Sequence, residues 1–153
     1  DRLGLHRPAL VASLLWTPVF LVVIAGLGFF LDMCMDARSE EALKLTELGR
    51  HSPVVFVLSL CVFAPVAEEL IFRGYAYSGW IRSMGWWLTA FVTSLLFALL
   101  HVQYGGIGLA YVFVLGLLLA LLRRVSGSVI PCIVLHAAAN AVFVISSFIS
   151  PVE

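Results

Sequence analysis

Residues 83–122, SMGWWLTAFVTSLLFALLHVQYGGIGLAYVFVLGLLLALL, form the longest stretch of the chain without Asp, Glu, Lys or Arg. Residues 9–31, 52–67 and 125–152 also lack these four residue types. A helix needs roughly 20 apolar residues to cross the hydrocarbon core of a bilayer. Because the turn signal QYGG at 103–106 divides the longest stretch into two, the sequence predicts about five membrane spans.

The overall composition also indicates a membrane protein. Of the 153 residues, 62% are hydrophobic and only 12% are charged, and the mean hydropathy is +1.07. A soluble domain needs more polar surface than this. The net charge is zero, so nothing indicates nucleic acid as a partner, and the expected surroundings are a lipid bilayer. We predict an all-α, polytopic transmembrane bundle with spans at 9–31, 53–81, 86–104, 108–122 and 128–149.

The charged residues outside the spans predict how the bundle is oriented. The polar segment 32–52 is rich in acids and contains apolar positions that suit a short amphipathic helix on the membrane surface. In a five-span bundle this segment lies on one side, and the basic loops lie together on the other side. The positive-inside rule places the basic loops in the cytoplasm. The arginines concerned are Arg2, Arg7, Arg82, Arg123 and Arg124.

We expect residues 1–153 to form a single transmembrane domain. The first residue is Asp1 rather than Met, which leaves open that the chain is a fragment of a longer protein.

Few ionisable residues fall inside the predicted spans, and such residues are costly in a bilayer and usually functional. Glu69 and Arg73 are four residues apart, which suits an ion pair along one helix. Glu68 points about 100° away from Glu69 and is therefore expected to be free for chemistry. The alternative that Pro65 ends the span, with both glutamates at the interface, stays open.

Three further polar residues are predicted to lie within the bundle. His136 and Asn140 share one helix face and are separated only by alanines, so this face is expected to be an interior one. A packing role for this pair stays open, and His101 taken alone suits a structural role equally well. At about 1.5 Å per residue, Glu68, His101 and His136 lie about 20, 22 and 12 Å from the basic end. They can therefore meet in one polar cavity, provided that the second span runs as a long helix past Arg73.

The order and spacing of these residues resemble the CPBP family, the CAAX proteases and bacteriocin-processing enzymes also called the Abi family. Its hallmarks are Glu-Glu-x-x-x-Arg, Phe-x-x-x-His and His-x-x-x-Asn, each on its own transmembrane helix. The resemblance covers residues 53–145 and departs at no motif position. The matching residues are Glu68 and Glu69 with Arg73, Phe97 with His101, and His136 with Asn140.

The resemblance implies a glutamate-dependent intramembrane endopeptidase that needs no cofactor. Glu68 would be the general base that activates water, and His101 would hold or polarise that water. His136 and Asn140 would stabilise the oxyanion of the tetrahedral intermediate, where donors gain strength as water is excluded. Arg73 with Glu69, and Phe97, would support the site. The substrate would be a membrane-associated protein or peptide precursor, and the location the cell membrane of a prokaryote.

Other functions stay open at this point. Glu68, His101 and His136 could instead bind zinc and leave a fourth position for water. No His-Glu-x-x-His helix is present, which favours the version without a metal. A membrane scaffold or immunity protein without catalysis is the alternative from another class, but the complete set of motif residues favours an enzyme. A proton-coupled transporter would show internal repeats with discontinuous helices, which this sequence lacks.

Overall fold

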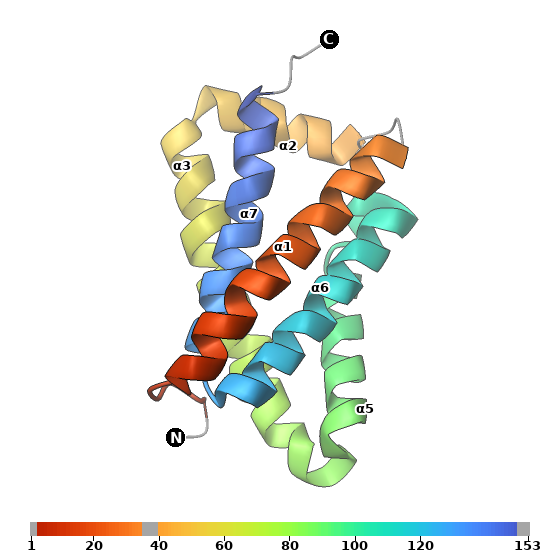
Figure 1. Cartoon of the computed structure of the whole chain (residues 1–153). Helices are drawn as coiled ribbons and strands as arrows, with labels where there is room; N and C mark the ends of the chain where they lie inside the picture. The colour runs from red at the N-terminus through yellow and green to blue at the C-terminus, as the bar shows by residue number, and fades with distance from the viewer. Residues whose placement is uncertain (1–2, 35–39, 150–153) are drawn as a thin grey trace.

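A computed structural model describes residues 3–34 and 40–149, and within these ranges every regular element is helical (Figure 1). Long helices run alongside one another, and α2 lies across one end of them. This arrangement confirms the predicted all-α membrane bundle. The longer elements are α1 (Leu10–Cys34), α2 (Glu40–His51), α5 (Tyr77–Leu99), α6 (Gly105–Ser126) and α7 (Ile130–Ile149).

Three helical stretches are long and apolar enough to cross a membrane: Leu10–Phe29, Pro53–Leu99 and Val102–Ser126. A shorter apolar helix covers Ile130–Ser146. The second stretch is not one straight span, because Gly85 has φ 72° and ψ 173° and interrupts the helix. Figure 1 shows the chain turning back there, so this stretch supplies two membrane-crossing segments of the bundle. We call each such segment a leg. Counted in this way, the described residues form the five legs that the sequence predicts.

The first leg of that stretch changes its helical type four times without breaking. It passes through α3 (Pro53–Leu58), the π-helix η1 (Ser59–Phe63), α4 (Ala64–Glu69) and the π-helix η2 (Leu70–Ala76) before α5 begins. The alternative in which a proline ends this span is therefore wrong. The helix continues past Arg73, as the predicted meeting of the polar residues requires.

The π-helix before Pro65 explains why the helix tolerates that proline. In η1 the N–H of Ala64 donates to the carbonyl of Ser59, five residues back. The next donor in that register would be Pro65, which has no N–H. Its acceptor, the carbonyl of Leu60, is therefore left for a side chain from another helix.

Several boundaries differ from the predicted spans. The third span was predicted to reach residue 104, but α5 ends at Leu99, and a turn and the short 3₁₀ helix η3 (Val102–Tyr104) follow. The fourth span was predicted at 108–122, but α6 runs from Gly105 to Ser126, so it includes both arginines. It ends there because Gly127 adopts the left-handed conformation, with φ 72°, that suits a helix C-terminus.

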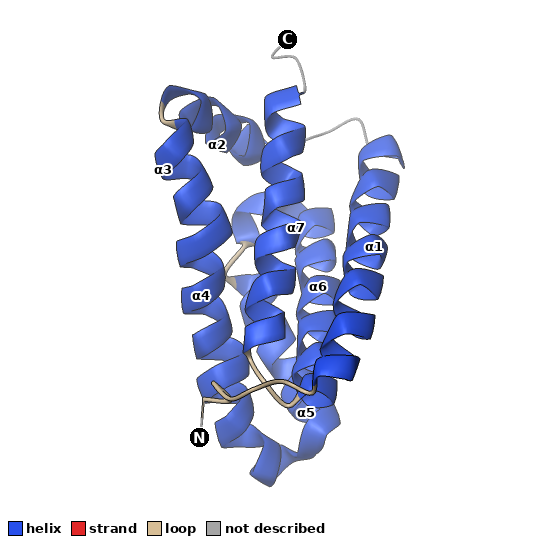
Figure 2. Cartoon of the chain, turned by 60° about the vertical axis from the view of Figure 1, so that its left-hand side comes forward, coloured by secondary structure: helices blue, strands red, loops and turns tan. Residues whose placement is uncertain are grey.

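The chain before α1 is fastened to the α6–α7 turn. The carbonyl of Gly4 accepts hydrogen bonds from the Ser128 hydroxyl and the Val129 N–H, both at 3.0 Å. The N–H of Ala9 donates to the carbonyl of Ser126 at 2.9 Å. Figure 2 shows this segment crossing the end of the bundle opposite α2. These bonds hold the N-terminal segment over that end.

α5 and α6 lie close together where Gly116 faces Ser94. A Cβ on Gly116 would lie 2.9 Å from the Ser94 Cβ and 3.1 Å from its Cα, closer than packed side chains normally come. We expect Gly116→Ala to lower the free energy of unfolding by about 1–3 kcal/mol, because the helices must move apart. Thermal unfolding in detergent measures this. Gly79→Ala is the matched control, since a Cβ there meets no atom within 4 Å; equal losses in both variants would contradict the prediction.

Candidate active site

The centre of the site is an ion pair within the 53–84 leg, between Glu69 and Arg73. Both side chains are fully buried, and Nη1 of Arg73 lies 3.1 Å from Oε1 of Glu69. The predicted pair is thus confirmed. The helix places these side chains on one face because they are four residues apart. Nη2 of Arg73 also donates to the carbonyl of Gly116 at 2.9 Å, which ties this leg to α6.

His136 on α7 contacts both adjacent glutamates. Its Nδ1 lies 3.0 Å from Oε1 of Glu69, and its Nε2 lies 3.8 Å from Oε2 of Glu68. Glu68, which the sequence predicts to be free for chemistry, therefore shares the His136 imidazole with Glu69. Although they diverge around their own helix, an imidazole from another helix fits between them, because its two nitrogens point in different directions.

These contacts fix the hydrogen on the His136 ring. A carboxylate can only accept a hydrogen bond, so Nδ1 must donate to Glu69. Nε2 then faces Glu68, either as the lone pair of a neutral ring or as a second N–H of the cation. The series of contacts from Arg73 through Glu69 to His136 therefore sets the orientation of Nε2, as carboxylate partners do for other functional histidines.

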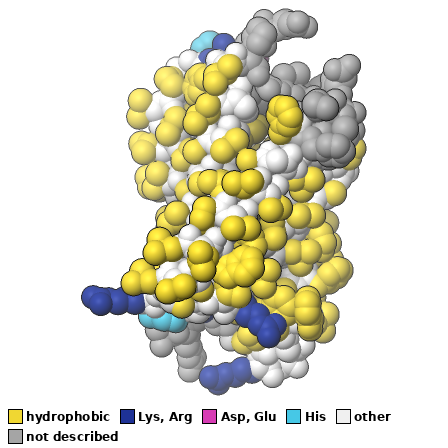
Figure 3. All heavy atoms as spheres, viewed as in Figure 1, with side chains coloured by type: hydrophobic (Ala, Val, Ile, Leu, Met, Phe, Trp, Pro, Cys, Tyr) yellow, Lys and Arg dark blue, Asp and Glu magenta, His cyan; other side chains and the backbone are white. Residues whose placement is uncertain are grey.

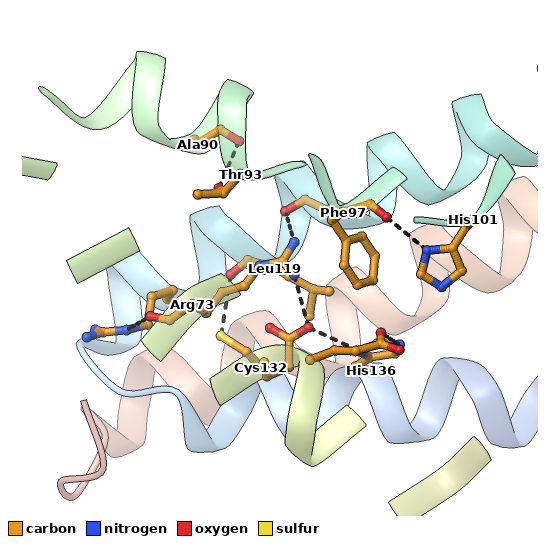
Figure 4. Close-up of polar contacts among 12 residues, drawn as sticks. Arg73, Ala90, Thr93, Phe97, His101, Leu119, Cys132 and His136 are labelled. Atoms are coloured by element: carbon orange, nitrogen blue, oxygen red, sulfur yellow. Dashed lines mark hydrogen bonds and ion pairs between the residues drawn. The ribbon is translucent and has the colours of Figure 1, made fainter. Parts of the chain in front are cut away.

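Phe97 is the packing centre of the site. Its ring is almost fully buried and lies under the guanidinium of Arg73, with Cζ 4.6 Å from the ring centroid. The ring centroids of His101 and His136 lie 5.0 and 5.6 Å from that of Phe97. Figure 4 shows Phe97 between the two histidines. Phe97 therefore positions charged and polar groups from three helices by contact.

His101 lies just beyond the end of α5 and is partly exposed. Its Nδ1 lies 2.9 Å from the carbonyl of Phe97, so Nε2 is the ring nitrogen left for another molecule. Tyr104 stacks on this imidazole, with centroids 5.7 Å apart and planes 26° apart. Sequence reasoning missed Tyr104 because it served only as part of a turn signal. Its spacing of three residues from His101 in a one-turn connection was the available signal.

Asn140 makes a hydrogen bond that the sequence did not predict. Its Nδ2 donates to the carbonyl of Leu60 at 2.7 Å, the acceptor left free by Pro65. It lies one helical turn from His136, as predicted, but the hydrogen bond ties it to η1. One N–H of the amide remains available to another acceptor.

Several buried polar atoms at the centre of the site have no hydrogen-bond partner among the described residues. They are Oε2 of Glu68, Oε2 of Glu69 and Nε of Arg73. Buried polar atoms without partners are uncommon in folded proteins, and a catalytic role or a bound water molecule can account for them. The described residues contain no group of three His, Cys, Asp or Glu side chains placed to hold a metal ion. The proposed zinc set of Glu68, His101 and His136 is therefore not assembled in this conformation.

Glu68 lies between the charged ends of the bundle and is partly exposed. On the face shown in Figure 3, most of the dark blue Lys and Arg side chains lie at the lower end, and the surface between the two ends is almost entirely apolar. The side chain of Glu68, between the two ends of the bundle, is 27% exposed. A carboxylate with an imidazole beside it, held away from bulk water, can accept a proton from a bound water molecule.

Comparisons with known proteins give a family match and a curated relative. A family model described as "Type II CAAX prenyl endopeptidase Rce1-like" matches residues 50–142. An "Uncharacterized 24.3 kDa protein" of Escherichia coli is 34% identical over 124 residues, which cover 78% of this chain and 57% of that protein. The chain thus spans a little over half the length of this curated relative. No solved structure matches the chain.

Proposed function

The chain belongs to the Rce1-like family of type II CAAX prenyl endopeptidases, and from that premise we propose that it cleaves a peptide bond at Glu68 within the membrane. The observation that supports this most directly is the pair of contacts made by His136. One ring nitrogen is fixed by the buried Glu69–Arg73 pair, and the other faces the partly exposed carboxylate of Glu68. Such an arrangement prepares one carboxylate for proton transfer and keeps the other as a structural anchor.

In the proposed reaction, Glu68 takes a proton from a water molecule as the water oxygen bonds to the carbonyl carbon of the substrate. The carbonyl π electrons move to its oxygen and form a tetrahedral oxyanion. The protonated Glu68 then gives its proton to the leaving nitrogen, and the C–N bond breaks as the carbonyl forms again. The products are a carboxylic acid and an amine, and Glu68 returns to its starting state.

The oxyanion would be stabilised by donors on α7. The Nε2 of His136, when protonated, and the second N–H of Asn140 are the candidates. The Leu60 carbonyl restrains the Asn140 side chain and so orders this second donor before the substrate arrives. Preorganised donors of this kind contribute about 2.7–4 kcal/mol each to transition-state stabilisation. His101, whose Nδ1 is already occupied, would orient the attacking water through Nε2.

The substrate in this proposal is a membrane-associated protein or peptide precursor, as the family implies. The chain is an integral membrane protein, and we place it in the cell membrane of a prokaryote. Catalysis without a metal remains our proposal.

The test compares peptides from cells that make equal amounts of the wild type or of Glu68→Gln. Mass spectrometry detects new peptide termini in membrane and secreted fractions. We expect termini that appear only with the wild type, and we expect purified enzyme to keep cleaving the corresponding peptide in a zinc chelator. Identical peptide sets, obtained in several hosts with both proteins folded, would support the non-catalytic scaffold instead. Loss of cleavage in the chelator, restored by zinc, would support the metal-dependent version.

The stacking of Tyr104 on His101 leads to a further prediction. We expect Tyr104→Leu to lower kcat about tenfold, because misplaced catalytic groups lose rate even when the substrate still binds. Tyr104→Phe keeps the stacked ring and should retain most of the activity. Steady-state cleavage of the identified peptide, with KM measured separately, checks both variants. Equal losses in Tyr104→Phe and Tyr104→Leu would show that the hydroxyl, and not the stacked ring, is what matters.

A further inference from the structure

We propose that the substrate reaches Glu68 from the α2 end of the bundle, so that the enzyme cleaves exported peptide segments on the extracytoplasmic side. This inference rests on the proposed function and specifies its substrate class. It follows from three features: a closed arginine-rich end, an open α2 side, and the distribution of charge between the two ends.

Polar packing closes the route from Glu68 toward the arginine-rich end. Glu69 and Arg73, one and five residues after Glu68, are fully buried. Beyond them, Nε of Arg123 donates to the carbonyl of Arg73 at 3.1 Å, and its Nη1 donates to the carbonyl of Gly127. The guanidinium of Arg123 also lies 5.5 Å from the ring centroid of the buried Tyr77. A peptide cannot pass this end without breaking these interactions.

The N-terminal segment adds a second layer over the same end. Gly4 accepts two hydrogen bonds from the α6–α7 turn, and its Cα packs against the Arg123 side chain so closely that a Cβ would overlap it. This segment crosses beneath the helices in Figure 2. The two layers, the arginine network and the segment bound over it, leave that end closed.

The opposite side of the site is more open. η2 packs along α5, whereas α4, which carries Glu68, packs against α7. The polar residues around this upper half are partly or fully exposed: Glu68, His101, Gln103, Tyr104 and Asn140. The exposed residues lie on the α2 side of the buried ion pair, so a peptide can approach the Glu68 carboxylate from there.

The charges then assign a side of the membrane to each end. Arg7, Arg82 and Arg124 are exposed at the closed end, and the guanidinium of Arg124 lies 4.3 Å from the ring centroid of Trp86. Trp86 is followed by the highly exposed Trp87, and tryptophans with arginines are typical of a membrane interface. Positive loops face the cytoplasm. α2, with the sequence EEALKLTELGRH, would then lie outside the cell together with the open side of the site.

This assignment selects among substrates. A prenylated C-terminus of a cytoplasmic protein would approach from the closed end. A secreted peptide precursor, or the outer flank of a membrane protein, would approach from the open side. We therefore infer that the enzyme acts on exported segments.

Cysteine labelling in intact cells tests the orientation without requiring activity. In a background with Cys34→Ser and Cys61→Ser, which keeps the fully buried Cys132, single cysteines replace Gln103 beside the site or Ser83 at the arginine-rich end. Both positions are exposed. We expect a membrane-impermeant maleimide to label Gln103→Cys in intact cells, and Ser83→Cys only after lysis. The reverse pattern would overturn the proposal.

The positions of the cleaved bonds test the direction of access. We expect the peptide termini that require Glu68 to map to secreted peptides or to outer segments of membrane proteins. Termini in cytoplasmic segments would overturn the inference even if the labelling followed expectation. The labelling should be the same in a Glu68→Gln background. If that labelling holds but no cleavage occurs in any host, the proposed function fails and the orientation stands.

Discussion

Glu68→Gln is expected to lower the rate of peptide cleavage at least a hundredfold. Glutamine has nearly the same shape as glutamate, but its amide cannot accept a proton from water. General bases contribute about 10²–10⁴-fold to the rates of the reactions that they assist. Because the Glu68 side chain is partly exposed and its ion-pair contact with His136 is as long as 3.8 Å, the substitution should leave the fold intact. Cleavage of the identified peptide under single-turnover conditions measures the effect.

Two further variants show whether the loss comes from the chemistry. Glu47→Gln changes the same group on the exposed surface of α2 and should keep the wild-type rate. Glu68→Asp keeps the carboxylate but withdraws it by one methylene, so it should retain part of the activity. The affinity of Glu68→Gln for the peptide should stay near that of the wild type. A rate for Glu68→Gln within threefold of wild type would exclude Glu68 as the base.

The parts of the site that lie within one helix could be predicted from the sequence. The Glu69–Arg73 pair follows from a spacing of four residues, which fixes the relative directions of two side chains on any helix. The legs of the bundle follow from apolar length, and the break at Gly85 lies within one residue of the predicted boundary. These features depend on local geometry and on the thickness of the membrane, and both are known before the fold is.

The contacts between helices could not be predicted in this way. How His136 divides its two nitrogens between Glu68 and Glu69 depends on the rotation of α7 about its axis, which spacing alone does not give. The bond from Asn140 to Leu60 depends on a π-helical register and on the N–H that Pro65 lacks. A sequence that places polar residues on facing helices predicts that they meet. It does not predict which atom meets which.

The family resemblance did not predict the role of Phe97 either. The motif Phe-x-x-x-His names Phe97 but gives no reason for an aromatic ring four residues before His101. The structure supplies one, because the ring contacts the guanidinium of Arg73 and both histidines. A leucine would fill the space without offering a face to the cation. Tyr104 performs a comparable packing role beside His101 and lies outside the three motifs.

Arg73→Met is expected to lower the free energy of unfolding by about 3–5 kcal/mol, because it leaves the fully buried Glu69 without its cation. It also removes the donor to the Gly116 carbonyl. Unfolding of the purified protein in detergent, by heat or by sodium dodecyl sulfate, measures the loss. Arg82→Met is the control, since that arginine is exposed at the arginine-rich end of the bundle, and it should change stability by less than about 0.5 kcal/mol.

The double variant Arg73→Met/Glu69→Gln separates the buried charge from the lost packing. Neutral glutamine can still accept the His136 Nδ1 hydrogen through its amide oxygen, and no uncompensated charge remains. We therefore expect the double variant to be more stable than Arg73→Met alone, since neutral replacement of a buried pair is often tolerated. If the double variant were no more stable than Arg73→Met, the loss would come from the missing arginine contacts rather than from the stranded carboxylate. If it regained stability but not activity, the charges of the pair would be needed to set the state of His136 and not only to hold the fold.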